Sequence, residues 1–340
     1  MTSYERIADL PVTIEQVTLE RLGQEVSSGF ARVSTEVVLA GRGASGRGED
    51  VCYTPEDHDL FPDLTQLAGS YTLDSFSRAL DAIDLFTSEP AFPSSRDYRR
   101  WALESSALDL ALRQEGSDLG TALGREAQPM RFCVSTRLDV RDWLAIDPNL
   151  EFKVDPVATW EPSYVEALAA TGRVRVLDFK AFYVGTAVDS VFDPGFYRMI
   201  ADTFPDAVLE DPAIDAPARA ALAGCDDRLS FDAPIHSLAD VDALPVAVRH
   251  LNIKPSRFGS LARLLACTDA CDERGISMYG GGQFELGVGR GQIQELASLL
   301  YPTTANDAAP GVYNAPAPVR GLPRSPLAPP AMHTGFGWRS

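Results

Sequence analysis

Short apolar segments rich in β-branched and aromatic residues recur along the second half of the chain, at intervals of about 20 to 30 residues. We expect strands at Arg131–Ser135, Leu150–Val154, Val174–Phe179, Ala207–Glu210, Leu229–Asp232, His250–Lys254 and Gly275–Tyr279. Segments with helical spacing of apolar residues lie between them, for example at Pro162–Ala170, Phe196–Phe204, Ser237–Leu244 and Ser260–Arg274. Alternating strands and helices predict a parallel sheet covered by helices, and seven or so such units favour a closed β/α barrel over an open sheet.

The pattern before residue 129 is different. Predicted strands at Val12–Leu19 and Ala31–Leu39 are followed by a glycine-rich turn at Gly41–Gly48 and by helical patterns at Leu73–Phe86 and Tyr98–Gln114. The second helix is apolar over more than half of its circumference, so we expect it to be buried on two sides. Strands followed by helices indicate an α+β domain.

The chain therefore divides into two predicted domains, an α+β domain at residues 1–128 and a barrel domain at residues 129–311. An Ala/Pro-rich stretch at residues 305–330 leads into an ending with two aromatic residues, Phe336 and Trp338. We expect residues 312–340 to run back over the first domain and to complete it, so that this domain is built from both chain ends.

Charge narrows the range of partners. The 340 residues include 30 basic and 48 acidic side chains, which gives a formal net charge of −18. Such a chain repels nucleic-acid phosphates and anionic membranes, and no basic run offsets this. We therefore expect neither a nucleic-acid nor a membrane partner, and favour small molecules, metal cations or other protein chains, with a homo-oligomer left open.

Cysteine usage and the lack of targeting signals favour the cytoplasm. The first twenty residues carry five charged side chains and no apolar core of a signal peptide. No apolar run approaches the roughly 18 residues of a membrane span. The five cysteines are odd in number and scattered, without a CxxC motif, so we expect free thiols in a reducing compartment.

Charged residues stand at the ends of five successive predicted barrel strands. Three of these strands end in carboxylates, Asp178, Glu210 and Asp232, and the strands on either side of them end in Lys153 and Lys254. Active sites of β/α barrels form at the carboxyl ends of the strands. Converging carboxylates repel each other unless a cation neutralises them, and an all-oxygen set suits Mg²⁺ above all. Lysines on opposite sides of a metal suit proton transfer on opposite faces of a substrate, with a pKa lowered by the neighbouring cations.

Several stretches resemble the enolase superfamily, of the muconate-lactonizing and mandelate-racemase type. Leu251-Asn-Ile-Lys-Pro-Ser-Arg-Phe-Gly259 is similar to the family's sixth-strand lysine motif, and Val208-Leu-Glu-Asp-Pro212 to the fourth-strand metal glutamate. Gly46-Arg-Gly-Glu49 resembles the G-x-G-E turn of the capping domain, Ala102–Arg113 a helix of that domain, and Gly280–Pro302 the last barrel strands. The resemblance spans nearly the whole chain and implies a TIM-like (β/α)7–8 barrel with an α+β capping domain.

The resemblance also implies roles for individual residues. Asp178, Glu210 and Asp232 match the metal ligands, Lys254 matches the sixth-strand acid/base, and Lys153 matches the second lysine of the K-x-K motif. It implies removal of the proton α to a carboxylate, assisted by Mg²⁺, with Mn²⁺ as the alternative ion, through an enediolate that the metal stabilises.

Three positions depart from the family pattern. Glu151 stands in place of the first lysine of K-x-K, Lys180 in place of the asparagine that follows the third-strand aspartate, and Ala233 in place of a common glutamate. Because side chains alternate along a strand, we expect Asp178 and Lys180 on one face, and Glu151 and Lys153 likewise. One hypothesis is that a lysine moved from strand two to strand three, with Glu151 as its ion partner. The change either retunes the base or puts Lys180 where the metal would bind.

Three functions stay open at this point. The leading hypothesis is an enolase-superfamily racemase, epimerase or cycloisomerase acting on a small carboxylate, because two opposed lysines favour proton transfer at one carbon. The second is a lyase, a syn-dehydratase resembling o-succinylbenzoate synthase. The third is a catalytically silent binding protein on the same fold, which Lys180 and Glu151 keep open. The substrate itself is not encoded in any motif, because specificity is expected in the cap loops at about 22–30 and 51–61.

The stretch Gly41-Arg-Gly43-Ala-Ser-Gly46 fits the G-x-G-x-x-G pattern of dinucleotide-binding folds. That motif should open a helix, whereas here acidic residues follow, which disfavour a phosphate site. We therefore expect a hairpin turn and no dinucleotide cofactor.

Overall fold

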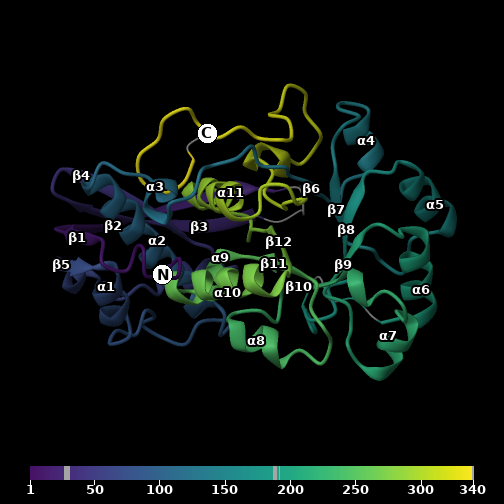
Figure 1. Ribbon diagram of the computed structural model, residues 1–340, viewed down its shortest axis with the longest axis horizontal. Coiled ribbons are helices and arrows are strands. Elements are labelled where there is room, and N and C mark those ends of the chain that lie inside the picture. The colour runs from purple at the N-terminus through teal and green to yellow at the C-terminus, as the bar shows by residue number, and fades with distance from the viewer. Residues whose placement is uncertain (27–30, 187–189, 191, 339–340) are drawn as a thin grey trace.

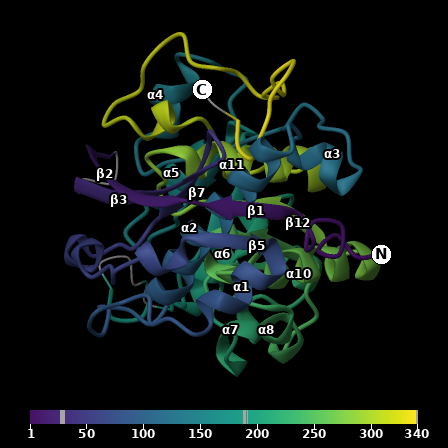
Figure 2. The same ribbon diagram turned by 90° about the vertical axis from the view of Figure 1, so that its left-hand side faces the viewer.

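The computed structural model describes residues 1–26, 31–186, 190 and 192–338. In this part of the chain a parallel sheet of seven strands is accompanied by a three-stranded and a two-stranded sheet (Figures 1 and 2). The strands are β1 (Pro11–Ile14), β2 (Gln16–Glu25), β3 (Ala31–Gly41), β4 (Ala44–Asp50), β5 (Gly69–Thr72), β6 (Val134–Ser135), β7 (Phe152–Val154), β8 (Val174–Asp178), β9 (Val208–Glu210), β10 (Leu229–Phe231), β11 (His250–Ile253) and β12 (Ser277–Gly280). The helices are α1 (Leu73–Leu80), α2 (Ser95–Gln114), α3 (Leu119–Leu123), α4 (Val140–Leu144), α5 (Pro162–Ala170), α6 (Pro194–Thr203), α7 (Ala216–Ala221), α8 (Leu238–Ala243), α9 (Pro255–Phe258), α10 (Leu261–Arg274) and α11 (Val288–Leu300).

The large sheet follows chain order from β6 to β12, and every neighbouring pair is parallel. Each predicted barrel strand overlaps one of these strands, which confirms the α/β class and the strand–helix alternation. The two edges of the sheet are joined by one short segment. Asn306 forms a parallel bridge with Phe132, just before β6, and Asp307 forms one with Gly281, just after β12. The number of barrel units, seven or eight, stays a prediction.

The first predicted barrel strand, Arg131–Ser135, is much shorter in the structure. Only Val134–Ser135 pairs with β7. The preceding backbone instead pairs with distant parts of the chain, since Met130 bridges to Leu327 and the amide of Cys133 donates to the carbonyl of Asn306 over 2.8 Å. These partners come from the C-terminal segment, which the local pattern could not reveal.

The α+β unit contains the antiparallel sheet β2-β3-β4 and the pair β1-β5. The predicted strand Val12–Leu19 is two strands that pair differently, β1 with β5 and β2 with β3. The turn predicted at Gly41–Gly48 is shorter in the structure, because Ala44–Asp50 is strand β4. Only Arg42 and Gly43 form the turn, with φ of 51° and 76°, the positive values that tight two-residue hairpins require. The G-x-G-x-x-G stretch therefore makes a hairpin and opens no helix.

Helix α2 lies directly on β4, as its apolar circumference predicted. A Cβ atom on Gly46 would lie 2.2 Å from the backbone nitrogen of Leu110, and one on Gly48 would lie 2.0 Å from the carbonyl oxygen of Ala102. Glycine at both positions is thus what allows strand and helix backbones to approach this closely. The helix is buried along most of its length.

The C-terminal segment, drawn in yellow in Figure 1, contacts both units. Tyr313 packs against Phe132 and Trp143 near the barrel. Further along, the ring of Phe336 meets Trp101 of α2 edge to face at 6.3 Å, and Trp338 is buried. All five cysteines are free and buried. Among the described residues, no helix combines the length and apolarity needed to cross a bilayer.

Candidate active site

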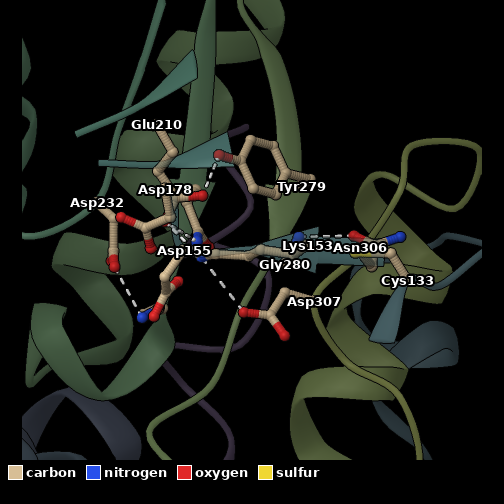
Figure 3. A network of polar contacts seen from close by, with 12 residues as sticks. Cys133, Lys153, Asp155, Asp178, Glu210, Asp232, Tyr279, Gly280, Asn306 and Asp307 are labelled. Atoms are coloured by element: carbon tan, nitrogen blue, oxygen red, sulfur yellow. Dashed lines mark hydrogen bonds and ion pairs between the residues drawn. The ribbon is translucent and has the colours of Figure 1, made fainter. Parts of the chain in front are cut away.

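Three carboxylates converge at the carboxyl end of the parallel sheet. Asp178 ends β8 and is paired in register with Glu210, which ends β9, while Asp232 directly follows β10. All three side chains are buried, and they offer oxygen atoms that lie within 4.8 Å of one another. Figure 3 shows Asp178, Glu210 and Asp232 facing a common centre. We call these residues the acidic triad.

Hydrogen bonds from two neighbouring strands fix the central member of the acidic triad. The hydroxyl of Tyr279 on β12 donates to Oε2 of Glu210 over 2.6 Å, and Nδ2 of Asn252 on β11 donates to Oε1 over 3.1 Å. Tyr279 also shares a hydrogen bond with Ser230 over 2.9 Å. Glu210 is therefore held in one orientation by uncharged groups as well as by charge.

All lysines of the chain lie at this site. Of 30 lysine and arginine residues, only Lys153, Lys180 and Lys254 are lysines. Nζ of Lys153 on β7 lies 2.5 Å from Oε1 of Glu210 and 3.1 Å from Oδ2 of Asp178. Nζ of Lys254, just after β11, lies 2.7 Å from Oδ2 of Asp232. Because the sheet order is β11-β10-β9-β8-β7, Lys153 and Lys254 come from the two strands that flank the acidic triad.

Lys180 approaches the acidic triad from a turn after β8. It has a φ of 56°, in the left-handed region that lysine adopts infrequently. Its backbone nitrogen donates to Oδ1 of Asp178 over 3.1 Å, and its ammonium group pairs with Oδ2 of the same carboxylate. The expectation that Lys180 and Asp178 share a strand face does not apply, because the chain has left the strand. The two side chains meet nevertheless.

A second set of polar groups surrounds Asp232. Nε of Arg257 lies 3.1 Å from Oδ1 of Asp232, and the hydroxyl of Tyr183 donates to Oδ2 over 3.3 Å. Arg257 also donates to the Tyr183 hydroxyl over 2.8 Å. Behind these groups, the buried carboxylate of Asp211 accepts hydrogen bonds from the backbone amides of residues 232 and 233.

Burial and mutual repulsion shift the titration of the carboxylates. Burial raises the pKa of Glu210 to about 8, opposed by Lys153 and reinforced by Asp178 and Asp232. Burial and the charge of Asp232 raise the pKa of Asp211 to about 7. The pKa of Asp178 is lowered despite its burial, because Lys180 and Lys153 stabilise the charged form.

Lys153 and Lys180 are held as ammonium groups. Burial lowers the pKa of Lys153, but Glu210 and Asp178 outweigh it, and the resulting pKa is well above the ordinary value. Lys180 behaves likewise, with Asp155 and Asp178 as the opposing charges. The sequence-based expectation was a lowered lysine pKa beside a metal ion. The carboxylates that are the nearest charges to these two lysines act in the other direction and raise the pKa, and the effect of a metal ion stays a prediction.

The acidic triad fits a hard divalent cation. Its donors are all carboxylate oxygens, which such ions prefer. Oδ1 of Asp232 and Oδ1 of Asn252 are buried in the described structure and accept no hydrogen bond, although Oδ1 of Asp232 forms an ion pair with Arg257. The ammonium groups of Lys153 and Lys180 contact the oxygens that an ion would use, yet each has a further carboxylate nearby. Nζ of Lys153 lies 3.4 Å from Asp307, and Nζ of Lys180 lies 3.8 Å from Asp155.

The hypothesis that Glu151 pairs with a lysine of the site is wrong. Glu151 precedes β7 and pairs with two arginines instead, Arg131 and Arg175, each at 2.6 Å. These partners hold the Glu151 carboxylate and lower its pKa against the effect of burial. Lys180 pairs with Asp178 and Asp155.

Several residues of the site were not found from the sequence, among them Tyr279, Asp211 and Asp307. Tyr279 is in a predicted strand, where an aromatic residue is expected to pack in the hydrophobic core. Asp211 follows Glu210 directly in the chain, so strand alternation alone predicts that its side chain points away from the site. Asp307 lies in the Ala/Pro-rich stretch and reaches Lys153 only because that stretch joins the two edges of the sheet.

Both halves of the chain match models of one protein family. The model described as the C-terminal domain of a domain of unknown function, DUF8230, matches residues 126–315, and the model of its N-terminal domain matches residues 5–122. Among curated proteins, o-succinylbenzoate synthase from Bacillus subtilis strain 168 is 42% identical over 57 residues, which are 17% of this chain and only 15% of that enzyme.

Solved structures of the enolase superfamily share the fold at low sequence identity. Muconate lactonizing enzyme from Pseudomonas putida superposes with a TM-score of 0.65 at 16% identity, covering 87% of this chain and 88% of that one. Muconate cycloisomerase from Pseudomonas fluorescens gives 0.64 at 14% identity, covering 88% and 87%. A superfamily member of unknown function from Enterococcus faecalis V583 gives 0.58 at 19% identity, covering 87% and 84%. The resemblance seen in the sequence is thus confirmed in the fold: the chain belongs to the DUF8230 family and has the fold of the enolase superfamily.

Proposed function

We propose that the protein binds Mg²⁺, or Mn²⁺ in its place, at Asp178, Glu210 and Asp232, and removes the proton α to the carboxylate of a small substrate. The observation that carries this proposal is the position of the lysines. Two of them, Lys153 and Lys254, come from the strands on either side of the acidic triad. A bound divalent ion would supply positive charge that stabilises negative charge developing on the substrate carboxylate.

The two lysines are proposed to move protons at their Nζ atoms. The carboxylates of Glu210 and Asp178 raise the pKa of Lys153, and a divalent ion bound to these carboxylates would offset that effect, so that the lysine can act as a base. Lys153 lies beside Asp178 and Glu210, and Lys254 beside Asp232. A Cβ atom on Gly281 would lie 3.0 Å from Cε of Lys254, so glycine at that position leaves room for the lysine side chain. Two proton-carrying groups on opposite flanks suit a reaction that takes a proton from one face and returns it on the other. We therefore favour a racemase, epimerase or cycloisomerase.

A syn-dehydratase is the second candidate. The local match to o-succinylbenzoate synthase supports it, although that match covers a small part of either chain. In such a reaction one lysine acts as the base, and the other stabilises the intermediate by its charge. A silent binding protein is the third candidate, and it is supported by the pairing of Lys153 and Lys180 with the acidic triad.

We further propose that residues 1–128, joined by 312–340, cap a barrel domain of residues 129–311, in which Asn306 and Asp307 take the place of an eighth strand. The segments near 22–30 and 51–61, expected as cap loops, are proposed to select the substrate. Residues 22–25 are the end of strand β2 rather than a loop, and residues 27–30 lie outside the described part of the chain. The free, buried thiols suit a reducing compartment, so we propose the cytoplasm.

The deciding experiment is α-proton exchange in D₂O across a library of small carboxylates, with and without added Mg²⁺. The proposal expects exchange of at least one library member that depends on Mg²⁺ and is lost in the double variant K153A/K254A. The matched control is R131Q, because Arg131 pairs with Glu151 outside the acidic triad. Mg²⁺ binding without exchange of any member would favour the silent binding protein. Exchange retained in the double variant would remove the lysines from the mechanism.

A further inference from the structure

Both oxygens of one proposed metal ligand are already held by a single residue. Lys180 donates its backbone N–H to Oδ1 of Asp178 over 3.1 Å and pairs its ammonium group with Oδ2. The left-handed backbone at Lys180, with a φ of 56°, turns the chain back so that both contacts are made. Oδ2 of Asp178 also lies 3.1 Å from Nζ of Lys153. A cation that binds to Asp178 must therefore compete with these ammonium groups.

Lys180 has a second carboxylate within reach, outside the acidic triad. Its Nζ lies 3.8 Å from Oδ1 of Asp155, which follows β7. Asp155 and Lys180 are both largely buried, with side chains 17% and 16% exposed. The outer side of Asp155 meets Arg137 at 3.3 Å. The ammonium group of Lys180 thus lies between a triad carboxylate and a carboxylate outside the triad.

Electrostatic repulsion prevents Asp178 from pairing with the Lys180 ammonium group and binding a divalent ion at the same time. A divalent ion and an ammonium group that share one carboxylate lie a few ångströms apart, and in a buried site their repulsion is several times larger than in water. Pairing with Asp155 keeps the ammonium group of Lys180 neutralised while increasing its distance from the ion. An unpaired buried ammonium group would be far more costly.

We propose that Lys180 is a tethered cation, which holds Asp178 when no divalent ion is bound and pairs with Asp155 when one is. The proposal rests on the metal site of the proposed function but is independent of the reaction. It gives Asp155 a role as a positioning residue for Lys180. It also implies that the protein binds Mg²⁺ more weakly than the acidic triad alone would.

The test measures Mg²⁺ affinity by titration calorimetry in a double-mutant cycle. We expect K180Q to bind Mg²⁺ at least about tenfold more tightly than the wild type, because the competing charge is gone. We expect D155N to bind about tenfold more weakly, because Lys180 loses its second partner. In the K180Q background D155N should have no further effect, since there is no ammonium group left to relocate. The charge-retaining control, K180R, should stay within a few-fold of the wild type.

Several outcomes would overturn the proposal. Equal or weaker Mg²⁺ binding by a folded K180Q would mean that Lys180 does not compete, while leaving the proposed function intact. Independent effects of D155N and K180Q would break the link between the two residues. Mg²⁺ binding to neither the wild type nor K180Q would remove the metal site, and with it both this proposal and the metal-dependent function.

A spectroscopic measurement on the wild type avoids any effect of substitution on folding. Because the chain has three lysines, ¹³C labelling at lysine Cε yields three signals from one site. The Lys180 signal is identified by its loss in K180Q. It should shift when Mg²⁺ saturates the wild-type protein and should shift much less in D155N. An unchanged Lys180 signal at saturating Mg²⁺ would contradict the proposal even if all affinities agreed with it.

Discussion

Nζ of Lys153 on β7 lies 2.5 Å from Oε1 of Glu210 on β9, across the intervening strand β8. Glu210 also accepts hydrogen bonds from Tyr279 and Asn252. The carboxylate of Glu210 therefore contacts three neighbouring side chains, and Glu210 is the central residue of the acidic triad. Removing the charge while keeping the shape of the side chain separates its proposed metal-binding role from its packing role.

The first prediction concerns metal binding. Mg²⁺ should raise the melting temperature of the wild type, because a ligand that binds only the native state stabilises it, by about 2.7 kcal/mol at a concentration of 100 times Kd. E210Q should lose this shift. E151Q serves as a matched control and should keep it, since Glu151 pairs with Arg131 and Arg175 away from the acidic triad. A full Mg²⁺ shift in E210Q would put the ion elsewhere.

The second prediction concerns the two proton-transferring lysines. Replacing one with alanine should lower α-proton exchange by about 10²- to 10⁴-fold for the reaction that it serves. In an epimerase, K153A should stop exchange of one stereoisomer and spare some exchange of the other, and K254A should do the reverse. In a syn-dehydratase both variants act on the same stereoisomer and differ in severity. Near-normal exchange in K153A would exclude Lys153 as the base.

The acidic triad could be predicted from the sequence because the register of a parallel sheet brings successive strand ends together. Asp178 and Glu210 are paired in register. Because both residues stand at the ends of their predicted strands, the sequence is enough to predict that their side chains meet. The hairpin at Arg42–Gly43 and the burial of α2 follow from equally local patterns.

Contacts between distant segments could not be predicted in this way. Asp307 reaches Lys153 because a segment near the end of the chain joins both edges of the sheet, and nothing in its Ala/Pro-rich surroundings signals this. Strand alternation predicts Lys180 on the same face as Asp178, whereas its left-handed backbone takes it off the strand. The sequence predicts a lysine partner for Glu151, but arginines on neighbouring segments pair with it instead.

The third prediction concerns the C-terminal segment. The ring of Phe336 is buried against Trp101, and its backbone amide donates to Oδ1 of Asp109 over 2.7 Å. F336A should destabilise the protein by about 3–5 kcal/mol, as is typical when a buried phenylalanine side chain is removed. M332A is the control, because Met332 is 92% exposed and should leave the unfolding free energy unchanged. Chemical denaturation of both variants measures the difference. Equal stability would mean that the chain end is not docked in solution.

The same segment contacts a buried acid on helix α11, and the titration of this acid couples folding to pH. Glu295 on α11 accepts the amide hydrogen of Gly337 at Oε2 over 2.5 Å, and Nε2 of His333 lies 2.9 Å from its Oε1. Burial raises the pKa of Glu295 to about 8, and the charges of Asp118 and Asp109 add to the shift. The hydrogen bond from Gly337 and the charge of Arg113 oppose it.

The fourth prediction follows from the direction of this shift. A carboxyl group whose pKa is higher in the folded state binds more protons there than in the unfolded chain, so its stabilising effect is complete below the unfolded value near 4.5 and is lost as pH rises to about 8. The unfolding free energy of the wild type should therefore fall between pH 5 and pH 8, by up to a few kcal/mol from this group.

E295Q, which is neutral throughout, should lack that part of the decline and should be the more stable protein at pH 8. H333Q separates the contribution of the neighbouring imidazole. Urea denaturation at pH 5, 6.5 and 8 measures all three proteins, and parallel pH profiles of the wild type and E295Q would mean that Glu295 is already ionised in the folded protein.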